Sequence, residues 1–179
     1  ETGIGGRLDA TNIITPAFCV LTPVELEHTD ILGGTLEEIA SEKAGIIKQG
    51  VPVFSAEQSS PVERIFRETA GSAGAPIVFL NEETESFDLE RGMKHLSLRW
   101  KDGDTLEADL AMFGRHQAEN AALAALALRR TLPGLEPYLT GGISAARAAG
   151  RMEVMEGSPP LVFDGAHTPA SVKVLVRGL

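Results

Sequence analysis

Continuous apolar runs and helical segments alternate along the first half of the chain. Short, partly β-branched apolar runs occupy residues 17–22, 51–54 and 76–80, which is typical of strands buried on both faces of a parallel sheet. Between them, a Thr-x-x-Glu capping box opens a helix predicted over 35–47, and a second amphipathic helix is predicted over 61–70. This order predicts a βαβαβ unit with right-handed crossovers, and therefore an α/β fold.

The pattern changes to a period of two in the second half. Apolar and polar residues alternate over 96–100 and again over 106–112, on either side of an Asp-Gly pair, which predicts an antiparallel hairpin. An Ala-rich helix is predicted over 115–132, where a Pro-Gly pair ends it, and a short helix is predicted over 144–149. A small antiparallel sheet with helices is therefore expected after the parallel one.

A further change near Gly150 predicts a domain boundary. Strands are expected over 151–156 and 161–164, around a Gly-Ser-Pro-Pro turn, and a new helix follows them. The chain begins without Met and stops inside this last amphipathic pattern, so truncation at both ends is expected.

Composition narrows the class of protein. The 179 residues are 43% apolar and 23% charged, which excludes a disordered chain and allows one or two globular domains. Because 16 basic residues stand against 25 acidic ones, neither nucleic acid nor an anionic membrane surface is expected as a partner. The apolar runs are too short to span a bilayer. The single Cys19 allows no internal disulfide and favours a reducing, cytoplasmic compartment.

The most informative candidate residue is Lys43. It lies four residues after Ile39 and four before Ile47, on the apolar stripe of the predicted helix. One interpretation is a lysine that buries its methylenes and frees its ammonium group at the helix edge. The other is a functional amine, because a desolvated lysine is neutral enough to react with carbon dioxide and form a carbamate, which is an anionic metal ligand.

Glu1 and His28 are candidate companions of Lys43. His28 follows the first predicted strand, near the carboxyl end where open α/β sheets bind ligands. A carboxylate, an imidazole and an anionic lysine derivative would together suit Mg²⁺ or Mn²⁺, although each residue alone is more often structural. The Gly-Ile-Gly-Gly sequence that begins at Gly3 lacks a following Lys-Ser or Lys-Thr, so it is not a P-loop.

Polar residues also mark the second half. His116 and Asn120 share one face near the start of the Ala-rich helix, where the helix dipole attracts anions, although capping and surface polarity more often explain such residues. Asp164 and His167 lie at a strand end before a helix, which makes them candidates for a site. Arg151 could hold a phosphate bidentately or form a salt bridge at a hinge.

Five sequence blocks occur in a characteristic order: Glu-Thr-Gly-Ile-Gly-Gly-Arg-Leu-Asp-Ala-Thr-Asn over 1–12, Glu-His-Thr over 27–29, Ser-Glu-Lys-Ala-Gly-Ile-Ile-Lys over 41–48, Gly-Arg-Met-Glu over 150–153 and Asp-Gly-Ala-His over 164–167. Together they closely resemble the folylpolyglutamate synthase/dihydrofolate synthase branch of the Mur ligase superfamily. The resemblance implies part of a Mur ligase-like central ATP-binding domain over 1–149 and the beginning of a Rossmann-like C-terminal glutamate-ligase domain over 150–179. It also implies that the chain is a fragment without the family's P-loop, and that this fragment by itself would be inactive.

The resemblance implies an ATP-dependent amide ligase. ATP would phosphorylate a carboxylate of folate or dihydropteroate, and the amine of L-glutamate would attack the acyl phosphate. Phosphoryl transfer needs charge neutralisation and positioning, so two Mg²⁺ ions are expected. A cytoplasmic monomer with small-molecule substrates is expected. The alternatives are a Mur ligase acting on a UDP-linked peptidoglycan precursor and a non-catalytic nucleotide-binding module.

The family also implies roles for the candidates in the first half. Glu1 and His28 would be Mg²⁺ ligands, and Lys43 would be the carbamylated lysine that serves the second ion and catalysis. The pteroate pocket would be lined by Leu8, Asp9 and Ala10.

In the second half, the resemblance implies a nucleotide site. Asn120 would contact the base, Arg151 and Asp164 would hold the ribose and phosphates, and His167 would be a catalytic residue beside them. Thr168 departs from the family, which has Asn in this turn.

Overall fold

The computed structural model describes residues 1–90, 94–112, 114–151, 153–166 and 169–178. The chain divides into two compact units, Glu1–Glu82 and Glu83–Leu179. The boundary predicted near Gly150 falls inside the second unit, and the division into 1–149 and 150–179 stays a prediction. None of the described helices is long and apolar enough to cross a membrane.

The first unit is built on a three-stranded parallel sheet in the order β1-β2-β3, which confirms the predicted parallel arrangement. Its strands are β1 (Cys19–Leu21), β2 (Val53–Ser55) and β3 (Ile77–Phe79). All three residues of β2 are buried, as expected for a central strand covered on both faces. The helices are η1 (Ala10–Ile13), α1 (Thr29–Leu32), α2 (Leu36–Ala44), α3 (Ser60–Ser72) and the short α4 (Leu80–Glu83).

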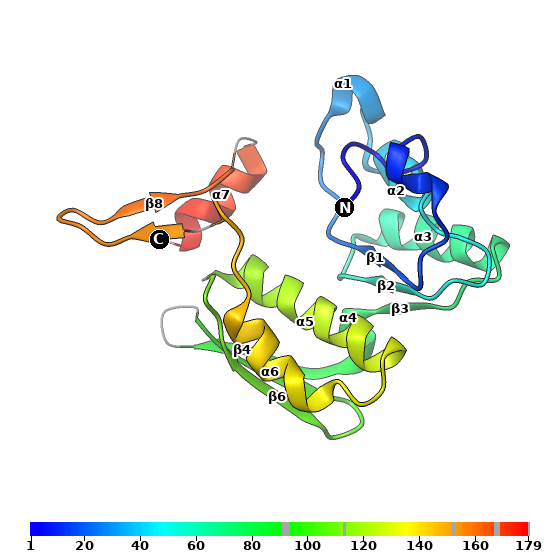
Figure 1. Ribbon diagram of the computed structural model, residues 1–179. Coiled ribbons are helices and arrows are strands. Elements are labelled where there is room, and N and C mark those ends of the chain that lie inside the picture. Colours follow the sequence, from blue (N-terminus) through cyan, green and yellow to red (C-terminus); the bar gives the residue numbers. More distant parts are fainter. Residues whose placement is uncertain (91–93, 113, 152, 167–168, 179) are drawn as a thin grey trace. The chain divides into compact units, whose positions relative to one another are not determined.

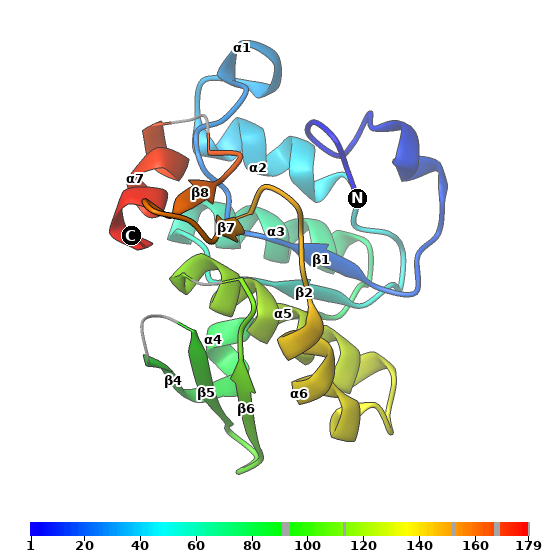
Figure 2. The same ribbon diagram turned by 60° about the vertical axis from the view of Figure 1, so that its left-hand side comes forward.

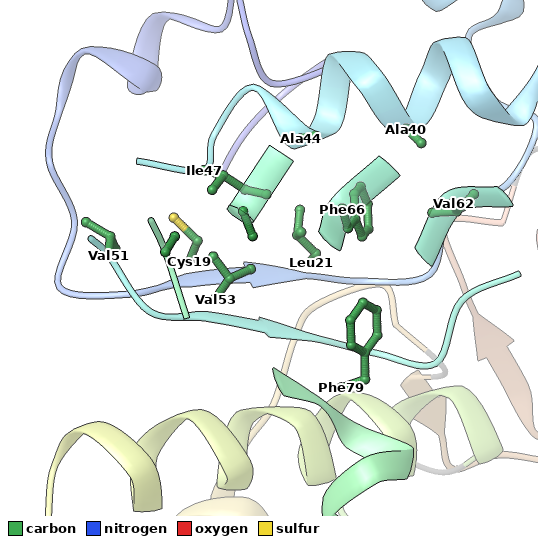
Figure 3. Packing of buried hydrophobic residues seen from close by; sticks show 12 residues of the cluster. Cys19, Leu21, Ala40, Ala44, Ile47, Val51, Val53, Val62, Phe66 and Phe79 are labelled. Atoms are coloured by element: carbon green, nitrogen blue, oxygen red, sulfur yellow. The ribbon is translucent and has the colours of Figure 1, made fainter. Parts of the chain in front are cut away.

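Helices α2 and α3 lie on the same face of this sheet (Figures 1 and 2). Their apolar sides meet the strands in one layer, in which Phe66 and Val62 of α3 are completely buried (Figure 3). Ala40 and Ala44 of α2 have small side chains, which let the helix approach the strands closely. This packing fixes the position of α2, the helix that carries Lys43.

The capping box predicted at Thr35 sets the start of α2. The Thr35 hydroxyl accepts a hydrogen bond from the backbone N–H of Glu38, and the Glu38 carboxylate accepts one from the N–H of Thr35. Helix α2 ends at Ala44, three residues earlier than predicted. The next residue, Gly45, lies against the backbone of Arg7, so the end of the helix coincides with a close tertiary contact.

The second unit contains an antiparallel sheet in the order β4-β5-β6, formed by β4 (Thr84–Glu90), β5 (His95–Trp100) and β6 (Thr105–Asp109). The predicted hairpin joins β5 and β6, and its turn includes Gly103 with φ 96°. Arg129 stabilises this turn from the neighbouring helix, since its guanidinium donates to Asp102 and Asp104 and lies over the ring of Trp100.

Helix α5 (Arg115–Thr131) confirms the predicted Ala-rich helix, and α6 (Glu136–Ala145) packs beside it and against β6. The helix predicted over 144–149 is therefore wrong in position: it begins at the Glu-Pro pair at 136–137. Two adjacent glycines inside α6 concealed its periodicity in the sequence. The remaining elements are β7 (Glu153–Met155), β8 (Leu161–Phe163) and α7 (Pro169–Gly178), with β7 and β8 antiparallel.

Replacing Phe66 with Ala should lower the free energy of unfolding by about 3–5 kcal/mol, because the fully buried ring leaves a cavity between α3 and the sheet. Urea denaturation measures the loss. Ile31→Ala is the control, since this side chain is 64% exposed, and it should change the free energy of unfolding by less than about 0.5 kcal/mol. Equal losses in the two variants would contradict the core described above.

Candidate functional site

A cavity of about 510 Å³ in the first unit is lined by the N-terminal segment, strand β1 and the end of α2. Glu1 and Lys43 both line it, together with Thr11 and Lys48. The two residues are separated by more than forty positions in the sequence, and the fold brings both of them to the lining of one cavity.

Lys43 is half-buried and occupies the turn of α2 between the buried Ile39 and the buried Ile47. Its backbone position agrees with the apolar stripe in the sequence, and the residue lines the cavity.

His28 lies at the start of α1 and is exposed. Its backbone adopts the left-handed conformation, with φ 52°, and its carbonyl accepts hydrogen bonds from Ile31 and Leu32. A non-glycine residue held in this conformation is uncommon, although His tolerates it better than most. Leu32 packs so close to Gly5 that a Cβ there would lie 2.9 Å from it, so α1 contacts the N-terminal segment.

The structure thus assembles the three candidate metal ligands in part. Glu1 and Lys43 line the same cavity, whereas His28 is not among its described lining residues. Within the described residues, no group of three or more His, Cys, Asp or Glu side chains is placed to hold a metal ion. The donor set fits an oxygen-preferring cation such as Mg²⁺ where a carbamate on Lys43 joins the carboxylate of Glu1.

The candidates for pteroate binding, Leu8, Asp9 and Ala10, lie outside the described lining of this cavity. Leu8 is 80% exposed. Asp9 caps η1: it accepts hydrogen bonds from Gly3 N and from both the N–H and the hydroxyl of Thr11, which hold the pKa of Asp9 below its usual value. Asp9 therefore shapes the loop that presents Leu8 to solvent.

Cys19 is the only cysteine of the chain and lies buried in β1, beside the same cavity. Its thiol donates to the carbonyl of Ile46 at 3.2 Å, and burial raises its pKa. A raised pKa keeps the sulfur protonated, so this thiol packs as a small apolar group.

The second unit has a cavity of about 470 Å³ between α5, α6 and the end of β6. Small residues open it, among them Ala121 and Ala124 of α5 and Gly142 of α6. Asn120 and Gln117 add amide groups to walls that are otherwise mostly apolar. Such a cavity suits a flat, largely apolar ring whose edge carries hydrogen-bonding atoms.

His116 lies in the first turn of α5 and is half-buried. Burial lowers the pKa of its imidazole, and the nearby carboxylates of Asp164 and Glu119 act in the opposite direction. Its Nε2 lies 3.2 Å from the side-chain nitrogen of Gln117. The Asp164 carboxylate is therefore near enough to His116 to influence its charge.

Arg151 and Asp164 come from two segments that lie side by side. The N–H of Gly165 donates to the carbonyl of Gly150 at 2.8 Å, and the Asp164 carboxylate accepts from Ala166 N at 2.8 Å. Arg151 is exposed beside Gly165. His167 and Thr168 lie outside the described residues.

Several residues that line these cavities have no role predicted from the sequence. Lys48 and Thr11 line the first, and Gln117 lines the second. Asn12 belongs to the block over 1–12, yet its contacts with residues more than thirty positions away are invisible in the sequence. Thr11, Asn12 and Lys48 lie inside the characteristic blocks, which is the only signal in the sequence that could have drawn attention to them, whereas Gln117 lies in none of these blocks.

The chain matches one protein family over most of its length. The profile of the Mur ligase middle domain matches residues 2–128, so the chain belongs to this family. Its relatives include the dihydrofolate synthase/folylpolyglutamate synthase of Bacillus subtilis, 35% identical over 99% of this chain and 43% of that protein. The Mycobacterium tuberculosis protein of the same name is 34% identical over 100% of this chain and 40% of that protein.

Solved structures agree with the sequence relatives. The Mycobacterium tuberculosis folylpolyglutamate synthase complexed with ADP matches with a TM-score of 0.89 and 30% identity, over 99% of this chain and 42% of that one. An FPGS-AMPPCP-folate complex matches with a TM-score of 0.89 and 29% identity, over 99% of this chain and 45% of that one. The predicted resemblance is confirmed, and the chain spans less than half the length of these relatives.

The pH dependence of folding tests the environment of His116. Because the pKa of His116 is lower in the folded than in the unfolded state, its neutral form is favoured by folding, and the free energy of unfolding should fall as the pH drops through and below 6.5. In His116→Gln this fall should be shallower, as measured by urea denaturation at a series of pH values. Parallel pH curves for the two proteins would contradict a buried imidazole at this position.

Proposed function

We propose that the intact protein is an ATP-dependent ligase that joins L-glutamate to a carboxylate of folate or dihydropteroate. The observation that carries the proposal is that Glu1 and Lys43 line the same cavity, in a chain whose structural relatives include an FPGS-AMPPCP-folate complex. The γ-phosphoryl group of ATP passes to the substrate carboxylate and ADP leaves. The amine of L-glutamate then attacks the acyl carbon, phosphate leaves and an amide remains.

In this proposal, Glu1 and a carbamate formed on Lys43 supply negatively charged oxygen atoms to the cavity. The Lys43 ammonium group would first lose a proton, and the neutral amine would then attack carbon dioxide and lose a second proton. The product is a carbamate with two oxygen ligands. Glu1, the carbamate and His28 would hold Mg²⁺, which neutralises phosphate charge during transfer when it is bound. His28 is assigned on sequence resemblance, since its described position is at α1 rather than on the cavity wall.

The second unit binds the nucleotide in this proposal. Asn120 presents both a donor and an acceptor to the edge of the base, and the apolar walls of the cavity take its ring. Arg151 donates to the phosphates, and the Asp164 carboxylate accepts from the ribose hydroxyls. His167 is proposed as a catalytic residue from the sequence resemblance alone, because it lies outside the described residues.

Leu8, Asp9 and Ala10 are proposed to contact the pteroate. The exposed side chain of Leu8 supports this role, because it offers an apolar surface to a ring system. Asp9 holds the loop and still has acceptor capacity at its carboxylate. The cytoplasmic location and the monomeric state stay predictions from the sequence.

Lys43→Ala should reduce ligation more than about a hundredfold, because the carbamate oxygens are lost. A small carboxylate added to the assay should restore part of the activity, whereas Lys43→Arg should stay inactive, since a guanidinium cannot become an anionic ligand. Incorporation of radiolabelled L-glutamate into dihydropteroate or a reduced folate measures the effect. Lys101→Ala, at an exposed turn, is the control with full activity.

Unchanged activity in Lys43→Ala would exclude the carbamate. Incorporation only with a UDP-muramoyl acceptor would replace the folate assignment by a Mur ligase acting on peptidoglycan precursors. Binding of nucleotide without any incorporation would indicate a binding module.

Asn120→Ala should raise the KM for ATP about tenfold and change kcat little, because it removes hydrogen bonds to a base that is remote from the reacting phosphate. Steady-state kinetics with varied ATP measures both constants. Asn81→Ala on the exposed start of α4 is the matched control. A fall in kcat at unchanged KM would show that Asn120 acts on the chemical step instead.

A further inference from the structure

Asn12 joins three backbone segments that are far apart in the sequence. Its side-chain nitrogen donates to the carbonyl of Arg7 and to the carbonyl of Gly45, each at 3.0 Å. Its own carbonyl accepts from the Nζ of Lys48 at 2.8 Å. The bond to Gly45 is partly buried, so solvent competes with it less than with a surface contact.

These bonds lie where the N-terminal segment touches the end of α2. The N–H of Arg7 donates to the carbonyl of Glu42 at 2.9 Å. A Cβ on Gly6 would lie 2.8 Å from the Glu42 carbonyl, and a Cβ on Gly45 would lie 2.4 Å from the Cβ of Arg7. Only glycines allow this approach, so the segment that begins with Glu1 packs in one position against the helix that carries Lys43.

The remaining contact across this junction is weaker. Arg7 and Glu42 form an ion pair at 2.7 Å, but the Arg7 side chain is 58% exposed and the Glu42 side chain 25%. Exposed pairs of this kind contribute little to stability because water screens them. The hydrogen bond from Asn12 to Gly45 is therefore less accessible to solvent than this ion pair.

We propose that Asn12 is a positioning residue that fixes the segment carrying Glu1 against the end of α2, so that Glu1 and Lys43 face the same cavity. This role rests on the proposed function of these two residues. Asn suits the position because one amide nitrogen supplies two N–H donors to two carbonyls. Asp at this position would direct carboxylate oxygens at the same carbonyls.

The test measures Mn²⁺ binding to the intact protein by electron paramagnetic resonance, together with hydrogen exchange of the backbone amides. Asn12→Ala and Asn12→Asp should each weaken Mn²⁺ binding about tenfold, with the larger loss in Asn12→Asp. Amides of residues 3–12 should exchange faster, while those of β2 and α3 keep their protection. Arg7→Gln is the matched control in the same loop and should weaken binding less than about threefold.

The outcomes separate the two proposals. Unchanged Mn²⁺ binding in the Asn12 variants, alongside clear losses in Glu1→Gln and Lys43→Ala, would overturn the role of Asn12 and leave the metal site standing. Faster exchange throughout β2 and α3 would show a merely structural residue, and would also overturn the role. Unchanged binding in Glu1→Gln and Lys43→Ala would overturn the metal site itself, and the positioning role with it, whether or not ligation is observed.

Discussion

The close approach of the N-terminal segment to the end of α2 is the constraint on which the candidate site depends. Gly6 and Gly45 let two backbones meet at a distance that any Cβ would prevent, and Asn12 ties the junction with hydrogen bonds to carbonyls on both sides. Helix α2 is itself held by its capping box and by the packing of Ala40 and Ala44 on the sheet. The positions of Glu1 and Lys43 therefore depend on how α2 packs on the core.

The two units present different chemistry. The first unit combines charged side chains with a cavity beside a parallel strand, which suits anionic and cationic ligands. The second unit offers a cavity with mostly apolar walls between α5 and α6, with amide groups at Asn120 and Gln117, which suits an aromatic base. A ligase that uses ATP needs both kinds of surface, because phosphoryl transfer depends on charge and nucleotide recognition depends on ring stacking and hydrogen bonds.

Much of the fold could be predicted because it rests on local signals. The apolar runs of β1, β2 and β3, the Thr35 capping box and the Asp-Gly turn of the β5–β6 hairpin are all encoded within a few residues. Strand β4 was not predicted, because its residues are largely polar and it becomes a strand only by pairing with β5. The glycines of α6 likewise masked a helix whose stability comes from packing on β6.

By itself, the sequence determined the α/β class, the position of Lys43 on an apolar stripe and the membership of the chain in the Mur ligase family, because these depend on short-range periodicity and on motifs in fixed order. The tertiary structure alone decided which residues share a cavity. Glu1 and Lys43 line the same cavity, and Asn12 forms hydrogen bonds with Gly45 and Lys48, although more than thirty positions of sequence separate the partners. A local sequence pattern cannot predict such long-range contacts, because they depend on how the chain packs around its core.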